Sequence, residues 1–206
     1  IRCGMGCIGT MEEWNASKWL RCSVNPRCSL EGLRNVAPLQ KKKRVAIVGG
    51  GPGGMEAARL ATVRGHAVTL YERRKLGGAM HEAAWDPDLK LDIQFLVDYY
   101  VRQMEKLKVK IVNEEATVDK ILDGGYDVVI VATGAGCKGS QVPGCDKPHV
   151  FSPLAVTGGK ENELGQSVIV VGAGVIGAEI AVSQAMKGKK VTLTTRRGAQ
   201  MGPYEI

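Results

Sequence analysis

The 206-residue chain has few aromatic side chains, no long apolar run and three histidines. Aromatic residues make up 5% of the sequence, which argues against the stacking platforms on which many proteins bind bases. No run of about 20 apolar residues occurs, so we expect no membrane-spanning helix. The sequence also contains no Ser-His-Asp arrangement, HExxH motif or P-loop lysine. We therefore expect no catalytic side chain, and assign the chemistry to bound cofactors.

The chain has 28 basic and 21 acidic side chains. Much of the excess of basic side chains lies in residues 1–44, around the run Lys41–Arg44. Such a run can bind nucleic acid or act as a nuclear address. No interleaved aromatic residues or nucleic-acid motif accompany it, so we interpret it as a solvent-exposed approach to the next strand. We expect neither nucleic acid nor a membrane as a partner. No secretion signal is visible, and we expect a cytoplasmic protein.

Four of the six cysteines fall in the first 28 residues, at Cys3, Cys7, Cys22 and Cys28. A disulfide framework does not suit a chain that otherwise reads as an ordinary α/β protein. Glycines between Cys3 and Cys7 allow backbone N–H groups to face the sulfurs of an iron–sulfur cluster. A four-thiolate zinc site that uses Cys28 is the competing interpretation, and a chance grouping is the third.

A dinucleotide-binding fingerprint follows this segment. A strand predicted over Arg44–Val48 leads into a glycine-rich turn, a helix and a second strand over Ala67–Tyr71. The turn contains Gly49, Gly51, Pro52, Gly53 and Gly54. Gly49 makes the tight bend, Gly51 lets a pyrophosphate approach, and Gly54 allows close packing of the helix on the strand. Glu72 ends the second strand, where a carboxylate can accept the hydroxyls of an adenosine ribose.

A second fingerprint begins with the strand Ser167–Val171 and ends with the strand Lys190–Thr195. Its turn contains Gly172, Gly174, Val175, Ile176 and Gly177. The position that matches Glu72 is Thr195, and Arg196 and Arg197 follow it. Without a carboxylate there, these arginines can bind a 2′-phosphate, which favours NADPH over NADH; the alternative is two solvent-exposed arginines.

Glu179 follows the second turn and matches the acid of a GxGxxGxE pattern common in nicotinamide-binding domains of related flavoproteins. The alternative interpretation is a first-turn acid that interacts favourably with the helix dipole.

Taken together, IRCGMGCIG and the later CSVNP resemble the iron–sulfur segment of the NADH:flavin oxidoreductases related to 2,4-dienoyl-CoA reductase, enoate reductase and trimethylamine dehydrogenase. The resemblance implies that Cys3, Cys7 and Cys22 are three ligands of a 4Fe–4S cluster and that Cys28 is not a ligand. The fourth ligand is then expected immediately before Ile1. In this family an FMN-binding (β/α)8 barrel precedes the cluster, and an FAD domain with an inserted nicotinamide domain follows it.

The apolar segment Asp127–Gly134 reads as a strand that ends in Ala-Thr-Gly, as in flavoproteins with two dinucleotide-binding domains. By this resemblance several further residues contact FAD: Arg73, Gly78, Ala79, Ala116, Ala132, Thr133 and Gly134. Many family members have a glutamine where Ala79 stands. The chain therefore lacks that side-chain contact but keeps the backbone contacts.

We expect an α/β protein with tandem Rossmann-like domains, both incomplete. Residues 1–44 form the iron–sulfur segment and linker, residues 45–150 half of the FAD domain, and residues 151–206 the start of the NAD(P) domain. The chain reads as an interior piece of a longer enzyme. The resemblance implies hydride transfer from NAD(P)H to FAD, then electron flow through the cluster to FMN in the barrel of the parent chain, which reduces an enoate or enoyl-type C=C bond.

Two alternatives stay open. In an amine dehydrogenase resembling trimethylamine dehydrogenase, this region binds ADP as a structural ligand. In a flavoprotein reductase subunit, it supplies electrons to a separate partner.

Overall fold

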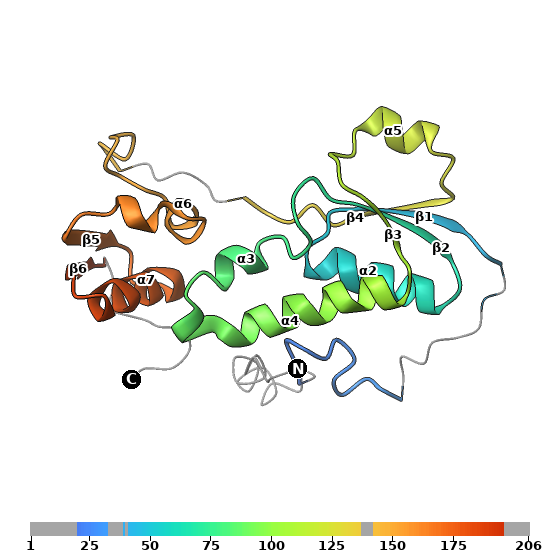
Figure 1. Ribbon diagram of the computed structural model, residues 1–206, viewed down its shortest axis with the longest axis horizontal. Helices are drawn as coiled ribbons and strands as arrows, with labels where there is room; N and C mark the ends of the chain where they lie inside the picture. The colour runs from blue at the N-terminus through green and yellow to red at the C-terminus, as the bar shows by residue number, and fades with distance from the viewer. Residues whose placement is uncertain (1–19, 33–38, 40, 137–141, 196–206) are drawn as a thin grey trace. The chain divides into compact units, whose positions relative to one another are not determined.

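The computed structural model of the protein describes residues 20–32, 39, 41–136 and 142–195. The described chain forms two compact units. The first unit includes the residues up to Ala84 and Leu91–Gly136, and the second includes Trp85–Lys90 and the residues after Gly136. Figure 1 labels the elements of both.

The first unit is built on a parallel sheet of four strands in the order β3-β2-β1-β4. The strands are β1 (Arg44–Val48), β2 (Ala67–Tyr71), β3 (Lys110–Val112) and β4 (Val128–Val131). The helices α2 (Pro52–Val63) and α4 (Pro87–Lys106) pack on one face of this sheet (Figure 1). Two short helices, α3 (Met80–Ala83) and α5 (Val118–Asp123), lie in the connections.

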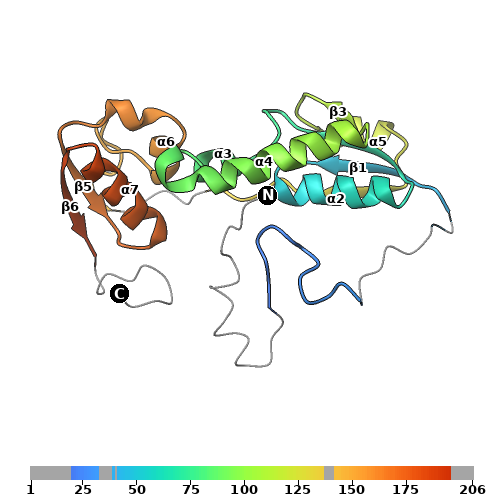
Figure 2. The same cartoon turned by 60° about the horizontal axis from the view of Figure 1, so that its bottom comes forward.

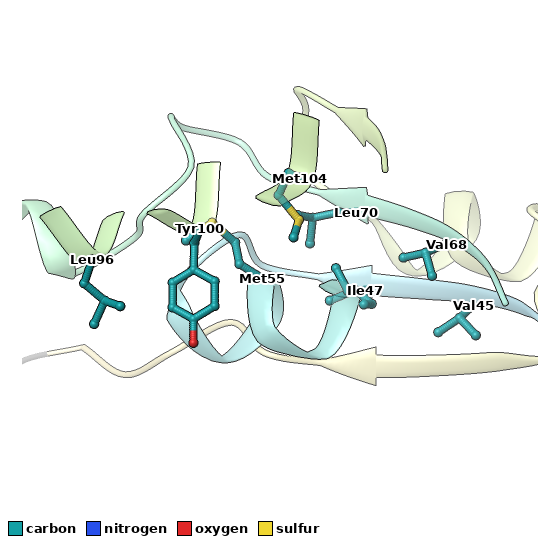
Figure 3. Close-up of a cluster of buried hydrophobic side chains, with 9 residues drawn as sticks. Val45, Ile47, Met55, Val68, Leu70, Leu96, Tyr100 and Met104 are labelled. Carbon is teal, nitrogen blue, oxygen red and sulfur yellow. The ribbon is translucent and has the colours of Figure 1, made fainter. Parts of the chain in front are cut away.

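The core of the first unit lies between the sheet and these two helices (Figure 3). Alternate strand residues point to this face because the side-chain period of a strand is two. From α4, Leu96, Tyr100 and Met104 are spaced by four residues and so share one side of the helix. The set of buried core residues is Val45, Ile47, Met55, Ala58, Val68, Leu70, Leu96, Tyr100 and Met104.

The second unit contains two parallel strands, β5 (Ser167–Val171) and β6 (Lys190–Thr194), joined by α7 (Val175–Met186). Figure 2 shows α7 beside this pair of strands. The short α6 (Pro153–Thr157) and the 3-10 helix η2 (Lys160–Glu163) precede β5. None of the helices in the described ranges has the length and apolar character needed to cross a bilayer.

The α/β class with Rossmann-like units is confirmed. The predicted bounds of β1, β2 and β5 agree with the structure, and β6 ends one residue earlier than expected. The strand expected over Asp127–Gly134 is shorter, since only Val128–Val131 pair with the sheet. The helix α4 begins at Pro87 and has non-helical backbone angles at Lys90 (φ −132°, ψ 22°).

We expect Leu70→Ala to lower the free energy of unfolding of the first unit by about 2–5 kcal/mol, because it removes a fully buried side chain and leaves a cavity. Leu122→Ala is the matched control: Leu122 in α5 is 73% exposed, so the same substitution should change stability by less than about 0.5 kcal/mol. Urea unfolding followed by circular dichroism measures both, and equal losses would contradict the position of the core.

Candidate functional site

The first glycine-rich turn connects β1 to α2. Gly49 has φ +106°, and its N–H donates to the carbonyl oxygen of Tyr71 at 2.9 Å. A Cβ atom on Gly49 would lie 2.3 Å from the carbonyl oxygen of Ala132. Both the positive φ and this close approach require glycine. The turn thereby lies against the last residue of β2 and the first residue after β4.

The helix α2 begins directly at this turn. Gly51 is its N-cap residue, with φ −72° and ψ −178°, and Pro52 and Gly53 are its first two helical residues. No side chain caps this end by a hydrogen bond, so a bound anion can interact with the N–H groups and the partial positive charge of the helix N-terminus. A Cβ atom on Gly51 would meet no heavy atom within 4 Å. The turn therefore fits a pyrophosphate at the position where a helix N-terminus binds anions.

Close contacts between backbone atoms fix the shape of the turn. A Cβ atom on Gly54 would lie 1.8 Å from the carbonyl oxygen of Gly49. Sequence reasoning did not single out Gly50, where a Cβ atom would lie 2.7 Å from Leu76 and 2.9 Å from the Glu72 Cβ atom. The signal for Gly50 is its place as the middle residue of three consecutive glycines, Gly49–Gly51.

Glu72 lies at the end of β2 and is 8% exposed. Its two carboxylate oxygens accept hydrogen bonds from the backbone N–H groups of Gly50 at 2.7 Å and Arg74 at 2.8 Å. Each oxygen keeps a further lone pair for another donor. The carboxylate is thus fixed beside the glycine turn, and it stands at the sequence position where the fingerprint predicts an acid.

A salt bridge stabilises the loop that follows Glu72. Arg74 Nη1 lies 2.6 Å from Glu82 Oε1. Burial raises the pKa of Glu82, but the hydrogen bond from Arg74 opposes it, and the net result, aided by further favourable contacts, is a lowered pKa. Glu82 therefore stays ionised at neutral pH and holds α3 to this loop.

The Gly77-Gly78 loop lies against the glycine turn. The N–H of Gly77 donates to the carbonyl oxygen of Gly50 at 2.9 Å, and a Cβ atom on Gly78 would lie 2.9 Å from the Gly51 Cα atom. Ala79 is the N-cap residue of α3. Sequence reasoning missed His81, whose Nε2 lies 2.8 Å from the carbonyl oxygen of Leu76 and supports this loop.

The segment Ala132-Thr133-Gly134 follows β4 at the same sheet edge. The Ala132 N–H donates to the carbonyl oxygen of Val48 at 2.8 Å, and Gly134 has φ +77° with open space around it.

Arg73 forms an ion pair at 3.1 Å with Glu115, the residue that precedes Ala116. This pair is exposed to solvent. Ala116 lies in the loop between β3 and α5.

The second turn has the same conformation as the first. Gly172 has φ +111°, and its N–H donates to the carbonyl oxygen of Thr194 at 2.8 Å. A Cβ atom on Gly177 would lie 2.0 Å from the carbonyl oxygen of Gly172. Gly174 is the N-cap residue of α7, with φ −73° and ψ 175°, and has no heavy atom within 4 Å of a Cβ position. Val175 and Ile176 in the first turn of α7 are half-exposed.

Glu179 is the fifth residue of α7 and forms an ion pair with Lys90. Its interpretation as a first-turn acid is wrong, because α7 begins at Val175 and its first turn contains no acidic residue. The strand β6 ends at Thr194. Arg196 and Arg197 lie outside the described residues, so the preference for NADPH stays a prediction.

The metal-binding segment is described only in part. Cys22 and Cys28 are half-buried and form no disulfide in the described ranges. Cys3 and Cys7 lie outside these ranges. No cluster of three or more His, Cys, Asp or Glu side chains that could hold a metal ion occurs among the described residues. The 4Fe–4S site therefore stays a prediction.

One open and one crowded position of the first turn, Gly51 and Gly54, give a matched test. Gly51→Val should fold but lower the affinity for a dinucleotide by more than about tenfold, since the new side chain enters the open space where a phosphate would bind. Gly54→Val should instead prevent the turn from forming, because its side chain would collide with the Gly49 carbonyl group. Circular dichroism and flavin retention separate the two effects. Unchanged flavin retention in a folded Gly51→Val variant would contradict the assignment of the turn.

Comparison with known proteins agrees with this geometry. The chain is 36% identical over 194 residues to cinnamate reductase of Clostridium sporogenes, an alignment that covers 94% of this chain and 28% of the reductase. It is 32% identical over 230 residues to dimethylamine dehydrogenase of Hyphomicrobium sp. (strain x), covering 99% of this chain and 31% of that protein. The chain thus spans about 30% of the length of these curated relatives.

A solved structure of 2-naphthoyl-CoA reductase bound to 2-naphthoyl-CoA superimposes with a TM-score of 0.75 and 36% sequence identity. The match covers 84% of this chain and 27% of the reductase. These relatives confirm the resemblance to enoate reductases and amine dehydrogenases that the sequence motifs carry. The family model for pyridine nucleotide-disulphide oxidoreductases matches residues 43–205, which include both glycine turns. The chain therefore belongs to the pyridine nucleotide-disulphide oxidoreductase family.

Proposed function

We propose that this chain is the electron-entry portion of a multi-cofactor flavoprotein oxidoreductase. The observation that carries the proposal is the pair of glycine turns with the same conformation, each with an open N-cap glycine at a helix N-terminus, Gly51 and Gly174. The first turn would hold FAD and the second NAD(P)H; the bound nucleotide would supply a hydride to the flavin, and a 4Fe–4S cluster would carry the electrons singly toward FMN in a barrel domain.

The first turn is the proposed FAD site. The N–H groups at the start of α2 would bind the pyrophosphate, and the ordered carboxylate of Glu72 would accept hydroxyl groups of the ribose. The backbone of Gly78 and of Ala132-Thr133-Gly134, which lies at the same edge, would provide further contacts. Arg73 and Ala116 would lie at the adenine end, since the Arg73–Glu115 ion pair brings their loops together.

The second turn is the proposed NAD(P)H site. The N-terminus of α7 would bind its pyrophosphate, as α2 would for FAD. Thr195 occupies the position that Glu72 occupies in the first unit, and the sequence continues with Arg196 and Arg197. Because no acid stands at this position to repel a 2′-phosphate, we propose NADPH as the preferred donor.

The remaining parts of the proposal concern the cluster and the substrate. Cys3, Cys7 and Cys22 would supply three thiolates to the cluster. The names of the reductases among the relatives favour an enoate or enoyl-type substrate, reduced in a part of the enzyme that this chain does not include. A cytoplasmic location stays a prediction.

A second candidate function is supported by the relatives of the other type. The match to dimethylamine dehydrogenase covers 99% of this chain. If the enzyme is of this amine dehydrogenase type, it oxidises an amine, and the first turn binds ADP as a structural ligand. The fold and the glycine turns suit both candidates, because an ADP group contains the ribose and pyrophosphate that the first turn would contact.

Cofactor analysis of the full-length enzyme distinguishes the two candidates. We expect FAD and FMN in equal amounts, with about four iron and four sulfide per chain, as one cluster on four thiolates requires. FMN together with bound ADP and no FAD would instead establish the amine dehydrogenase type. Stoichiometric zinc in place of iron would contradict the cluster.

A further inference from the structure

Three successive carbonyl groups of the Gly77-Gly78 loop accept hydrogen bonds from the start of α3. The carbonyl oxygen of Leu76 lies 2.8 Å from His81 Nε2. The Gly77 carbonyl oxygen accepts from the Met80 N–H at 3.1 Å, and the Gly78 carbonyl oxygen from the His81 N–H at 3.2 Å. Two of the three bonds therefore come from His81. Only the bond from its ring depends on which side chain stands at this position.

The acceptor fixes the state of the His81 ring. A carbonyl oxygen only accepts hydrogen bonds, so Nε2 carries a proton and donates it to Leu76. The ring lies directly against Gly77, where a Cβ atom would come within 2.5 Å of Nε2. Val97 of α4, which is 2% exposed, would lie 3.0 Å from the same Cβ atom. The His81 ring and a buried side chain of α4 thus meet the loop at one point and leave room there only for glycine.

The residues that His81 holds are the ones that touch the first glycine turn. The Gly77 N–H donates to the Gly50 carbonyl oxygen at 2.9 Å. Leu76 Cδ2 would lie 2.7 Å from a Cβ atom on Gly50, and a Cβ atom on Gly78 would lie 2.9 Å from the Gly51 Cα atom. Gly51 is the N-cap residue of α2, where a pyrophosphate would bind. The position of the loop therefore determines how closely its backbone approaches a phosphate at this helix.

We propose that His81 is a positioning residue of the first dinucleotide site, which holds the Gly77-Gly78 backbone against the pyrophosphate of the bound nucleotide. Its ring acts through the Leu76 carbonyl group and does not itself touch the nucleotide. The requirement is an N–H donor at the position of Nε2, so another side chain that places a donor there can replace histidine. The inference rests on the proposed function of the first turn, and it adds a side chain that the glycine fingerprint does not contain.

The rate at which the full-length holoenzyme releases its bound FAD or ADP tests this role. His81→Phe keeps a ring but removes the donor, and should raise the release rate about tenfold, since the loop loses one hydrogen bond. His81→Gln should stay within about twofold of the parent, because its amide nitrogen can take the place of Nε2. His81→Asn, whose amide is one bond shorter, should behave as His81→Phe does. Chromatography of the released nucleotide measures the rate and identifies the nucleotide.

Two further measurements separate positioning from general support of the fold. His66→Phe is the matched control: His66 lies at the other end of β2, where its Nδ1 accepts from the Lys43 N–H at 3.3 Å, and its loss should leave the release rate unchanged. Once the bound nucleotide has been removed from the full-length enzyme, ADP should bind about tenfold more weakly to His81→Phe than to the parent. Adenosine has no pyrophosphate and should bind both equally.

The possible failures are distinguishable. If the parent holoenzyme retains neither FAD nor ADP, the proposed function of the first turn is wrong, and the inference fails with it. If the parent retains its nucleotide and His81→Phe releases it at the same rate, or His81→Gln releases it as fast as His81→Asn, His81 has no positioning role and the proposed site stands. If His81→Phe weakens ADP and adenosine equally, the role of His81 is structural.

Discussion

Both candidate sites depend on one contact, in which the first glycine of each turn touches the last glycine of its motif: Gly49 with Gly54, and Gly172 with Gly177. In α2 the Gly54 Cα lies so near the Gly49 carbonyl group that a Cβ atom would come within 1.8 Å of its oxygen, and in α7 the corresponding distance from Gly177 to Gly172 is 2.0 Å. This contact brings each helix N-terminus to the carboxyl end of its strand. The helix N-terminus can then meet a phosphate there, because its own N–H groups have no side-chain cap.

Around this contact the two units differ in ways that suit different ligands. The first unit adds the buried Glu72, held by two backbone N–H groups, and a loop in which Gly78 touches Gly51. The second unit has no acid at the matching position and instead carries Glu179, already paired with Lys90. Beside the first turn, Glu72 can accept hydrogen bonds from ribose hydroxyls. Beside the second turn, the carboxylate of Glu179 is already paired with a positive charge.

The strands, the two glycine turns and the position of Glu72 could be predicted from the sequence, because short apolar strands, glycine spacing and an acid at a strand end are local signals. The strands β1, β2 and β5 have the bounds that these signals predict. The predictions are less accurate at the ends of two strands: β4 is shorter than the apolar run Asp127–Gly134, and β6 ends at Thr194 rather than Thr195. The pairing of Lys90 with Glu179 and the approach of Gly50 to Glu72 depend on tertiary packing between distant segments, which no local pattern encodes.

Anaerobic stopped-flow reduction of the full-length enzyme tests the central claim most directly: the first turn holds the flavin, and the second delivers its electrons. NADPH should bleach the visible absorbance of the oxidised flavin in the parent enzyme. A Gly174→Val variant should keep its flavin, yet be reduced more slowly by at least about tenfold at low NADPH, since a side chain would enter the open turn of α7. Loss of flavin from this variant, or reduction at the parent rate, would contradict the account.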